Sequence, residues 1–247
     1  MTKHSSQNGT RRAISGLQAI LVGLIVLFSL EITVATDEAS QRRPLDLPSG
    51  GGALSSLAYE IEEPEFDSNV IEFYGGYYEG DAFFWCLDRS TSMGPQNPGD
   101  KLEMLKAEVT DAIKQLSEDN EFGLVSFATS VTWFKNRPVR ATGAKKQAAI
   151  EWVNSMQPYG ATCISLGVVK ALEISTHSLM SNRRILLVGD GGPTCPGYSS
   201  ATMLEEINGA NWQRLPIDTI DIGANQDGIE ILKQIANQND GTYRLID

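Results

Sequence analysis

Residues 82–92, which read AFFWCLDRSTS, decide the fold. The first six of them, 82–87, are apolar without interruption, as is typical of a central parallel strand buried on both faces. A second apolar run at 185–188 has the same character. From about Val70 onward, strand-like and helix-like segments alternate around these two runs. This order predicts an α/β domain with a doubly wound, mainly parallel central sheet flanked by helices.

The other elements are expected from the period of the apolar residues. A helix begins near Gly99, with Leu102, Leu105 and Val109 on one face. Further strands are predicted at 122–127, 131–134, 217–222 and 242–246, and further helices at 145–156, 166–179, 201–210 and 229–236.

Composition excludes several classes of function. The 247 residues hold 20 Lys and Arg against 31 Asp and Glu, a net charge of −11, so a sequence-wide basic surface for nucleic acid is absent. Only two histidines occur, His4 and His177, which argues against a His-rich zinc site. Three cysteines are too few for a small domain held together mainly by disulfides.

The N-terminal part does not have a globular pattern. Residues 1–12 form a basic tail, and 13–36 contain the uncharged stretch AILVGLIVLF, either a signal anchor that spans the membrane or a cleaved signal peptide. Residues 37–69, rich in Pro, Gly and Ser, are expected to be a flexible linker to a domain at 70–247. The bases precede the apolar run, so the N-terminus is predicted to stay cytoplasmic and the rest to be exported. That exported part holds 17 bases and 30 acids.

Polar residues follow the apolar strands at one edge of the predicted sheet. Asp88, Ser90 and Ser92 end the first strand, and Asp190 ends the second. Thr162, two residues after a glycine, lies at the start of the helix expected at 166–179. It is therefore expected at the same edge of the sheet. Each residue by itself has a simpler explanation as a turn former or a helix cap. Because the carboxyl ends of parallel strands share one edge, a common site is favoured.

In order, spacing and strand context, these five residues resemble the complete metal-ion-dependent adhesion site of von Willebrand factor A (VWA) domains. The resemblance covers 70–247 and implies the Rossmann-like VWA fold. It implies that Ser90 and Ser92 bind a cation directly, that Thr162 does so directly or through water, and that Asp88 and Asp190 act largely through water. Such hard oxygen donors suit Mg²⁺ first, with Mn²⁺ or Ca²⁺ as alternatives.

The resemblance implies a protein-binding function without catalysis. With mostly neutral direct ligands, the ion keeps charge with which to accept a carboxylate from a partner protein. The chain is expected to be a single-pass membrane protein with an extracytoplasmic VWA domain, or a secreted or periplasmic one after cleavage. Two alternatives stay open: a non-catalytic accessory subunit of a larger assembly, and a Mg²⁺-dependent phosphotransferase or hydrolase using Asp88. Little basic character besides Arg89 is expected near the site, which counts against the enzyme.

The cysteines leave one question open. Cys86 lies within the first strand and is expected to be buried. Cys163 follows Thr162 directly, and Cys195 lies five residues after Asp190. In an exported domain these two form either a disulfide at the rim of the site or two free thiols.

Overall fold

The computed structural model describes residues 69–95 and 100–246. In this part of the chain the main sheet has the order β5-β4-β3-β7-β8-β9, with β6 also paired to β4. β3, β4, β7, β8 and β9 are mutually parallel, whereas β5 and β6 run antiparallel to β4. The strands are β3 (Ala82–Asp88), β4 (Glu121–Phe127), β5 (Val131–Trp133), β6 (Val139–Arg140), β7 (Arg183–Gly189), β8 (Ile217–Asp221) and β9 (Tyr243–Leu245). The predicted doubly wound, mostly parallel sheet is confirmed.

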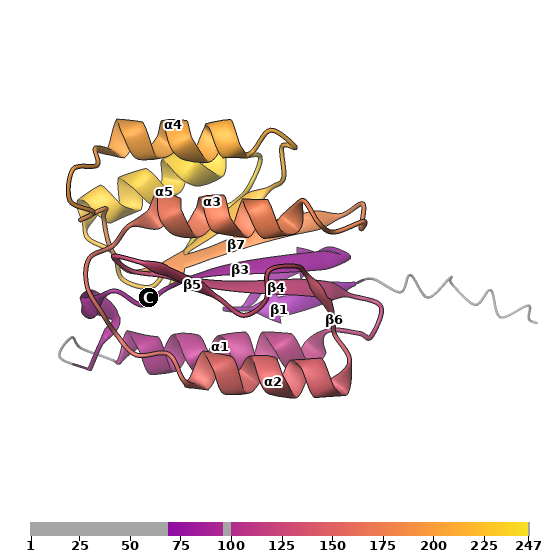
Figure 1. Ribbon diagram of the computed structural model, residues 1–247. Coiled ribbons are helices and arrows are strands. Elements are labelled where there is room, and N and C mark those ends of the chain that lie inside the picture. Colours follow the sequence, from indigo (N-terminus) through magenta and orange to yellow (C-terminus); the bar gives the residue numbers. More distant parts are fainter. Residues whose placement is uncertain (1–68, 96–99, 247) are drawn as a thin grey trace, which may run out of the picture. The chain divides into compact units, whose positions relative to one another are not determined.

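Helices cover both faces of this sheet, giving three layers (Figure 1). α1 and α2 lie on one face, and α3, α4 and α5 on the other. Their bounds are α1 (Lys101–Gln115), α2 (Gly143–Asn154), α3 (Ile164–Ser175), α4 (Ser200–Ala210) and α5 (Gln226–Gln238), and a single 3-10 turn, η1 (Thr91–Met93), follows β3.

β3 is central because both of its faces are apolar. Phe83, Trp85 and Leu87 point into the core beneath α1 and α2, while Phe84 and Cys86 point into the core beneath α3 to α5. The second core is tight at Gly167 of α3, where an added Cβ would stand 2.6 Å from a ring carbon of Phe127 and 2.8 Å from Cys86 Sγ. The absence of a side chain there lets α3 lie close against the sheet. Cys86 is a free, buried thiol, as expected.

Several features differ from the sequence expectations, among them the short strand β6, which was not predicted. A two-stranded antiparallel sheet, β1 (Val70–Phe73) and β2 (Gly76–Glu79), precedes β3 and was not anticipated. It turns at Tyr74 and Gly75, both with positive φ (50° and 66°), and Ile71, Phe73 and Tyr78 join the core beside α1. α3 ends at Ser175 instead of reaching 179, because Ser175 and Thr176 hydroxyls bond to carbonyls of the last turn and the chain then turns. His177 therefore lies beyond the helix and is exposed.

The described chain begins at the end of the sheet opposite the predicted site. The Asn69 side chain donates a hydrogen bond to Asp81 Oδ1 (3.0 Å), directly before β3 begins, whereas Asp88 is the last residue of β3. The apolar segment within 13–36 lies outside the described residues. Among those that are described, no helix has the length and apolar character needed to cross a membrane.

Candidate metal centre

The three predicted segments meet around one cavity of about 390 Å³ at the carboxyl ends of β3 and β7. Four of the five predicted residues line it, and Asp88 lies buried beneath them. The loop that follows β8 closes a further side. The lining is Ser90, Thr91, Ser92, Lys101, Gly160, Thr162, Asp190, Gly191, Gly192, Thr194, Gly223 and Asn225. The structure thus brings the predicted residues together, while their role as ligands stays a prediction.

The two serine hydroxyls point to the same place. Ser90 Oγ lies 3.0 Å from Ser92 Oγ, and the Ser92 hydroxyl donates to Asp190 Oδ1 at 2.7 Å. η1 sets this arrangement, since its buried Met93 anchors the turn in the core. Adjacent ligands of an octahedral ion with bonds of about 2.0–2.1 Å lie roughly 2.9 Å apart. The serine pair has the spacing of two such neighbours.

Asp88 is a fully buried carboxyl group with one uncompensated oxygen. Its Oδ1 accepts a hydrogen bond from the Ser90 backbone N–H at 2.6 Å. Its Oδ2 has no hydrogen-bond partner among the described residues. Burial raises the pKa of Asp88 to about 7, and the neighbouring Asp190 charge adds to the rise, while the hydrogen bond from Ser90 N–H and the charge of Lys101 oppose it. An orphaned oxygen of this kind favours a nearby cation or an ordered water.

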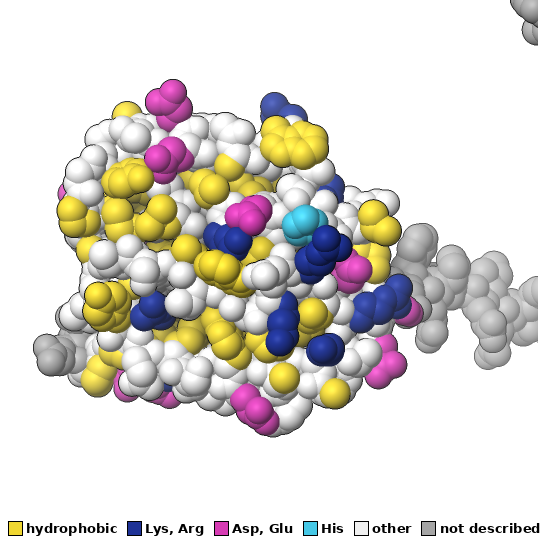
Figure 2. All heavy atoms as spheres, viewed as in Figure 1, with side chains coloured by type: hydrophobic (Ala, Val, Ile, Leu, Met, Phe, Trp, Pro, Cys, Tyr) yellow, Lys and Arg dark blue, Asp and Glu magenta, His cyan; other side chains and the backbone are white. Residues whose placement is uncertain are grey.

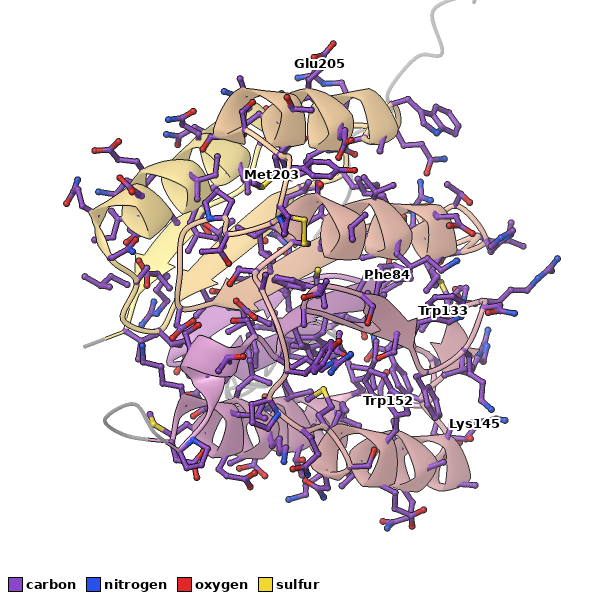
Figure 3. All side chains as sticks on the ribbon, turned by 60° about the vertical axis from the view of Figure 1, so that its left-hand side comes forward. Phe84, Trp133, Lys145, Trp152, Met203 and Glu205 are labelled. Atoms are coloured by element: carbon purple, nitrogen blue, oxygen red, sulfur yellow. A yellow bond between two sulfur atoms is a disulfide. The ribbon has the colours of Figure 1, made fainter. Side chains whose placement is uncertain are left out.

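A disulfide joins the other two segments of the site. Cys163 and Cys195 are bridged, with their Cα atoms 4.7 Å apart, which confirms the first of the two alternatives (Figure 3 shows a disulfide as a yellow bond). Beside it, Thr162 N–H donates to Thr194 Oγ1 at 2.9 Å, and Thr194 N–H donates to Thr162 O at 3.1 Å. The buried Thr162 is therefore held against the loop that carries Asp190.

Lys101 was missed by the sequence reasoning, which had found little beyond Arg89 as a base near the site. Its ammonium lies 2.9 Å from Asp190 Oδ2. Arg89 instead points away, toward the Gln157 carbonyl and the ring of Tyr159. The available signal was positional: a helix that starts directly after the loop following a central strand places its first residue at the site's edge.

A family model identifies the fold. The model described as von Willebrand factor type A domain matches residues 87–245. The chain belongs to the von Willebrand factor type A family. The chain is 25% identical over 210 residues to inter-alpha-trypsin inhibitor heavy chain H2 of Mus musculus. It is 30% identical over 161 residues to von Willebrand factor A domain-containing protein 3A of Homo sapiens. These matches cover 77% and 64% of this chain but only 21% and 12% of the relatives, so this chain spans a small part of their length.

Solved structures share the VWA fold at low identity. A von Willebrand factor type A protein from Catenulispora acidiphila has a TM-score of 0.60 at 19% identity, over 69% of this chain and 40% of that one. The pilus adhesin SpaC from Lactobacillus rhamnosus GG scores 0.57 at 16% identity, over 69% and 29%. The vWF domain of the type V pili tip protein Mfa5 from Porphyromonas gingivalis scores 0.55 at 13% identity, over 66% and 89%.

The VWA site is built from hydroxyls more than from charges. Within 69–95 and 100–246, no group of three or more His, Cys, Asp or Glu side chains gathers where it could hold a metal ion. A complete adhesion-type metal site is therefore not shown. The donors present nevertheless suit a hard divalent ion: two hydroxyls at ligand spacing, one orphaned carboxylate oxygen and a second carboxylate.

Proposed function

We propose that this VWA domain binds a partner protein through a divalent cation held by Asp88, Ser90, Ser92, Thr162 and Asp190. The observation that carries the proposal is the pair of serine hydroxyls 3.0 Å apart, together with the buried Asp88, whose Oδ1 is bonded to Ser90 N–H and whose Oδ2 has no hydrogen-bond partner among the described residues. A hydroxyl pair and a buried, partnerless carboxylate oxygen together favour an ion over an ordinary polar turn.

Each residue has a distinct role in the proposal. Ser90 and Ser92 would bind the ion directly, and Thr162 would do so directly or through water. Asp88 and Asp190 orient bound water and offset the charge of the ion. These residues would leave a bound ion one coordination position, which a carboxylate of the partner could occupy. The hydroxyl spacing suits Mg²⁺ first and Mn²⁺ next, because Ca²⁺ takes longer bonds of about 2.3–2.6 Å.

The surface beside the site supports a protein as the partner. VWA domains commonly serve protein interaction or adhesion, and similar structures include a pilus adhesin and a pilus tip protein. A groove of about 460 Å³ begins at Ser165, three residues beyond Thr162, and follows α3 between Val131 and Tyr198. Figure 2 shows apolar side chains gathered on this face. A partner that supplies a carboxylate to the ion can rest apolar side chains there.

The proposal includes a membrane tether or an export signal at 13–36, with the N-terminus cytoplasmic and the VWA domain extracytoplasmic. Asn69 lies at the amino end of β3, and the candidate site lies at its carboxyl end, about 20 Å away for a seven-residue strand. The candidate site therefore lies at the end of the sheet away from Asn69, the first described residue. The Cys163–Cys195 disulfide supports this placement, because disulfides persist mainly in oxidising compartments outside the cytoplasm.

Ion binding is tested by thermal unfolding of the full-length protein with Mg²⁺ or with EDTA. An ion at 100 times its Kd stabilises the fold by about 2.7 kcal/mol, which raises Tm by roughly 5–10 °C for a domain of this size. Ser90→Ala is expected to lose the shift. Ser181→Ala, an exposed serine just before β7 at the other end of the sheet, is the matched control and is expected to keep it. Equal Tm values for the wild type in Mg²⁺ and EDTA would remove the proposal.

Partner recognition needs its own experiment. Proteins retained by the immobilised wild-type chain in Mg²⁺ are compared with those retained in EDTA and by Ser90→Ala. The proposal expects a partner that elutes with EDTA and is absent from the Ser90→Ala eluate. Identical eluates would mean that any partner is bound without the ion.

An enzymatic role has less support. Lys101 supplies a charge of the kind that phosphoryl transfer uses, but it is paired with Asp190. The Asp88 carboxyl is fully buried and does not line the cavity, so it is badly placed as a nucleophile. Phosphoester turnover that depends on Asp88 would indicate the enzyme. An accessory, non-catalytic subunit would use the same cation site toward a larger assembly.

A further inference from the structure

Lys101 reaches into the candidate site from the first turn of α1. Its ammonium donates to Asp190 Oδ2 at 2.9 Å and to the Gly223 carbonyl at 3.1 Å. The Lys101 side chain is 18% exposed, and that of Asp190 only 2%. Among the described residues that line the cavity, these two are the ones with a formal charge. A mostly buried ion pair of this type differs from a surface lysine that meets an acid by chance.

The loop after β8 is shaped to receive this ammonium. Gly223 has a φ of +93°, and an added Cβ would stand 3.3 Å from Lys101 Nζ. The buried Asp221 holds the loop by accepting hydrogen bonds from the N–H groups of Gly223 (3.1 Å) and Ala224 (2.6 Å). The Gly223 carbonyl is thereby directed at Lys101. Two elements distant in sequence, the β7 end and the β8 loop, thus bind one ammonium.

We propose that Lys101 sets the charge of the cation site: it weakens binding of the divalent ion and makes the loaded site attractive to an anionic ligand. This inference rests on the proposed function. Asp88 and Asp190, both ionised, would cancel the charge of a divalent ion. The Lys101 ammonium then leaves the loaded site with one net positive charge, which a partner carboxylate neutralises.

The same arrangement explains how Asp190 stays in place without an ion. One of its oxygens accepts from Ser92 and the other from Lys101, so both are occupied by protein groups. The carboxylate is held where the resemblance expects it to act, through water and not by direct contact. Lys101 is therefore a positioning residue and a specificity determinant for the acidic partner group.

The test measures two affinities of the full-length protein. Mn²⁺ binding is followed by the electron paramagnetic resonance of the free ion. Acetate, the simplest carboxylate probe, is then titrated into the Mn²⁺-loaded protein and followed by water-proton relaxation. In Lys101→Gln, which keeps a hydrogen-bond donor without charge, Mn²⁺ is expected to bind at least about tenfold tighter. Acetate is expected to bind several-fold more weakly.

The opposite direction of the two changes distinguishes a charge effect from simple damage, which would weaken both. Lys106→Gln is the matched control. Lys106 is a buried lysine on the same helix whose ammonium lies 2.6 Å from Glu103 Oε1, and neither residue lines the cavity. It is expected to change neither affinity. Should Lys101→Gln fail to fold, Lys101→Met retains the apolar stem and carries the same expectations.

Two results separate the possible failures. If Mn²⁺ binds to the Lys101 variants no more tightly than to the wild type, while Ser90→Ala still abolishes binding, the role of Lys101 is overturned and the cation site stands. If the wild type itself binds no Mn²⁺, the proposed function fails and the role of Lys101 fails with it.

Discussion

The disulfide between Cys163 and Cys195 is expected to supply a large share of the stability of this domain. The perturbation is the double substitution Cys163→Ala, Cys195→Ala, which removes the bridge without leaving a polar group at the buried Cys163. The two residues are 32 apart in sequence. In the chain-entropy model, releasing a loop of that length costs about 3.7 kcal/mol at 25 °C. Small domains have unfolding free energies of only about 5–15 kcal/mol, so the loss is readily measured.

The assay is urea unfolding at 25 °C, followed by tryptophan fluorescence, with and without dithiothreitol. On the same entropy model, the free energy of unfolding of the double variant should be about 3–4 kcal/mol lower than that of the wild type. The wild type should lose a similar amount on reduction, and the double variant should not respond to dithiothreitol. Cys86→Ala, which removes the free thiol and keeps the bridge, is the control that should remain sensitive to reduction.

The reasoning would be refuted if the double variant unfolded within about 1 kcal/mol of the wild type, since the entropy model would then not apply to this loop. The effect on the cation site should be smaller than that of Ser90→Ala. The reciprocal hydrogen bonds between Thr162 and Thr194 still join the two segments once the bridge is gone.

Two further predictions concern packing and pH. Gly167→Ala should destabilise the fold by about 1–3 kcal/mol in urea unfolding, because the new Cβ would meet Phe127 and Cys86 below 3 Å. Gly209→Ala on α4, which has nothing within 4 Å, should stabilise by about 0.5–1 kcal/mol; equal effects at the two sites would contradict this packing. The pKa of Asp88 is raised to about 7, so the ion-free folded protein binds more protons than the unfolded chain between about pH 4 and pH 7. The contribution of Asp88 to the free energy of unfolding therefore falls as the pH rises through that window. In EDTA, the free energy of unfolding of Asp88→Asn should rise by roughly 2–4 kcal/mol relative to that of the wild type between pH 4 and pH 8. A difference between the two proteins that does not change with pH would contradict the raised pKa.

Local patterns were sufficient for most of the sheet and helix order. β3 and β7 contain continuous apolar runs, at 82–87 and 185–188, and a run of that kind has few alternatives to a buried parallel strand. The strands β1 and β2 were not predicted, because they are short and follow a polar, linker-like segment. Where α3 ends depended on hydroxyl-to-carbonyl hydrogen bonds that the apolar period does not encode.

By itself, the sequence determined which residues gather at the candidate site. A carboxylate or hydroxyl placed directly after a central parallel strand must lie at one edge of the sheet, so Asp88, Ser90 and Asp190 could be grouped without coordinates. Only the tertiary structure decided the pairing of Cys163 with Cys195 and the contact of Lys101 with Asp190. Both join residues from different crossovers, and such contacts depend on how the loops bend after the strands end. The charge of the site, and with it the chemistry of the proposed partner, follows from those loops.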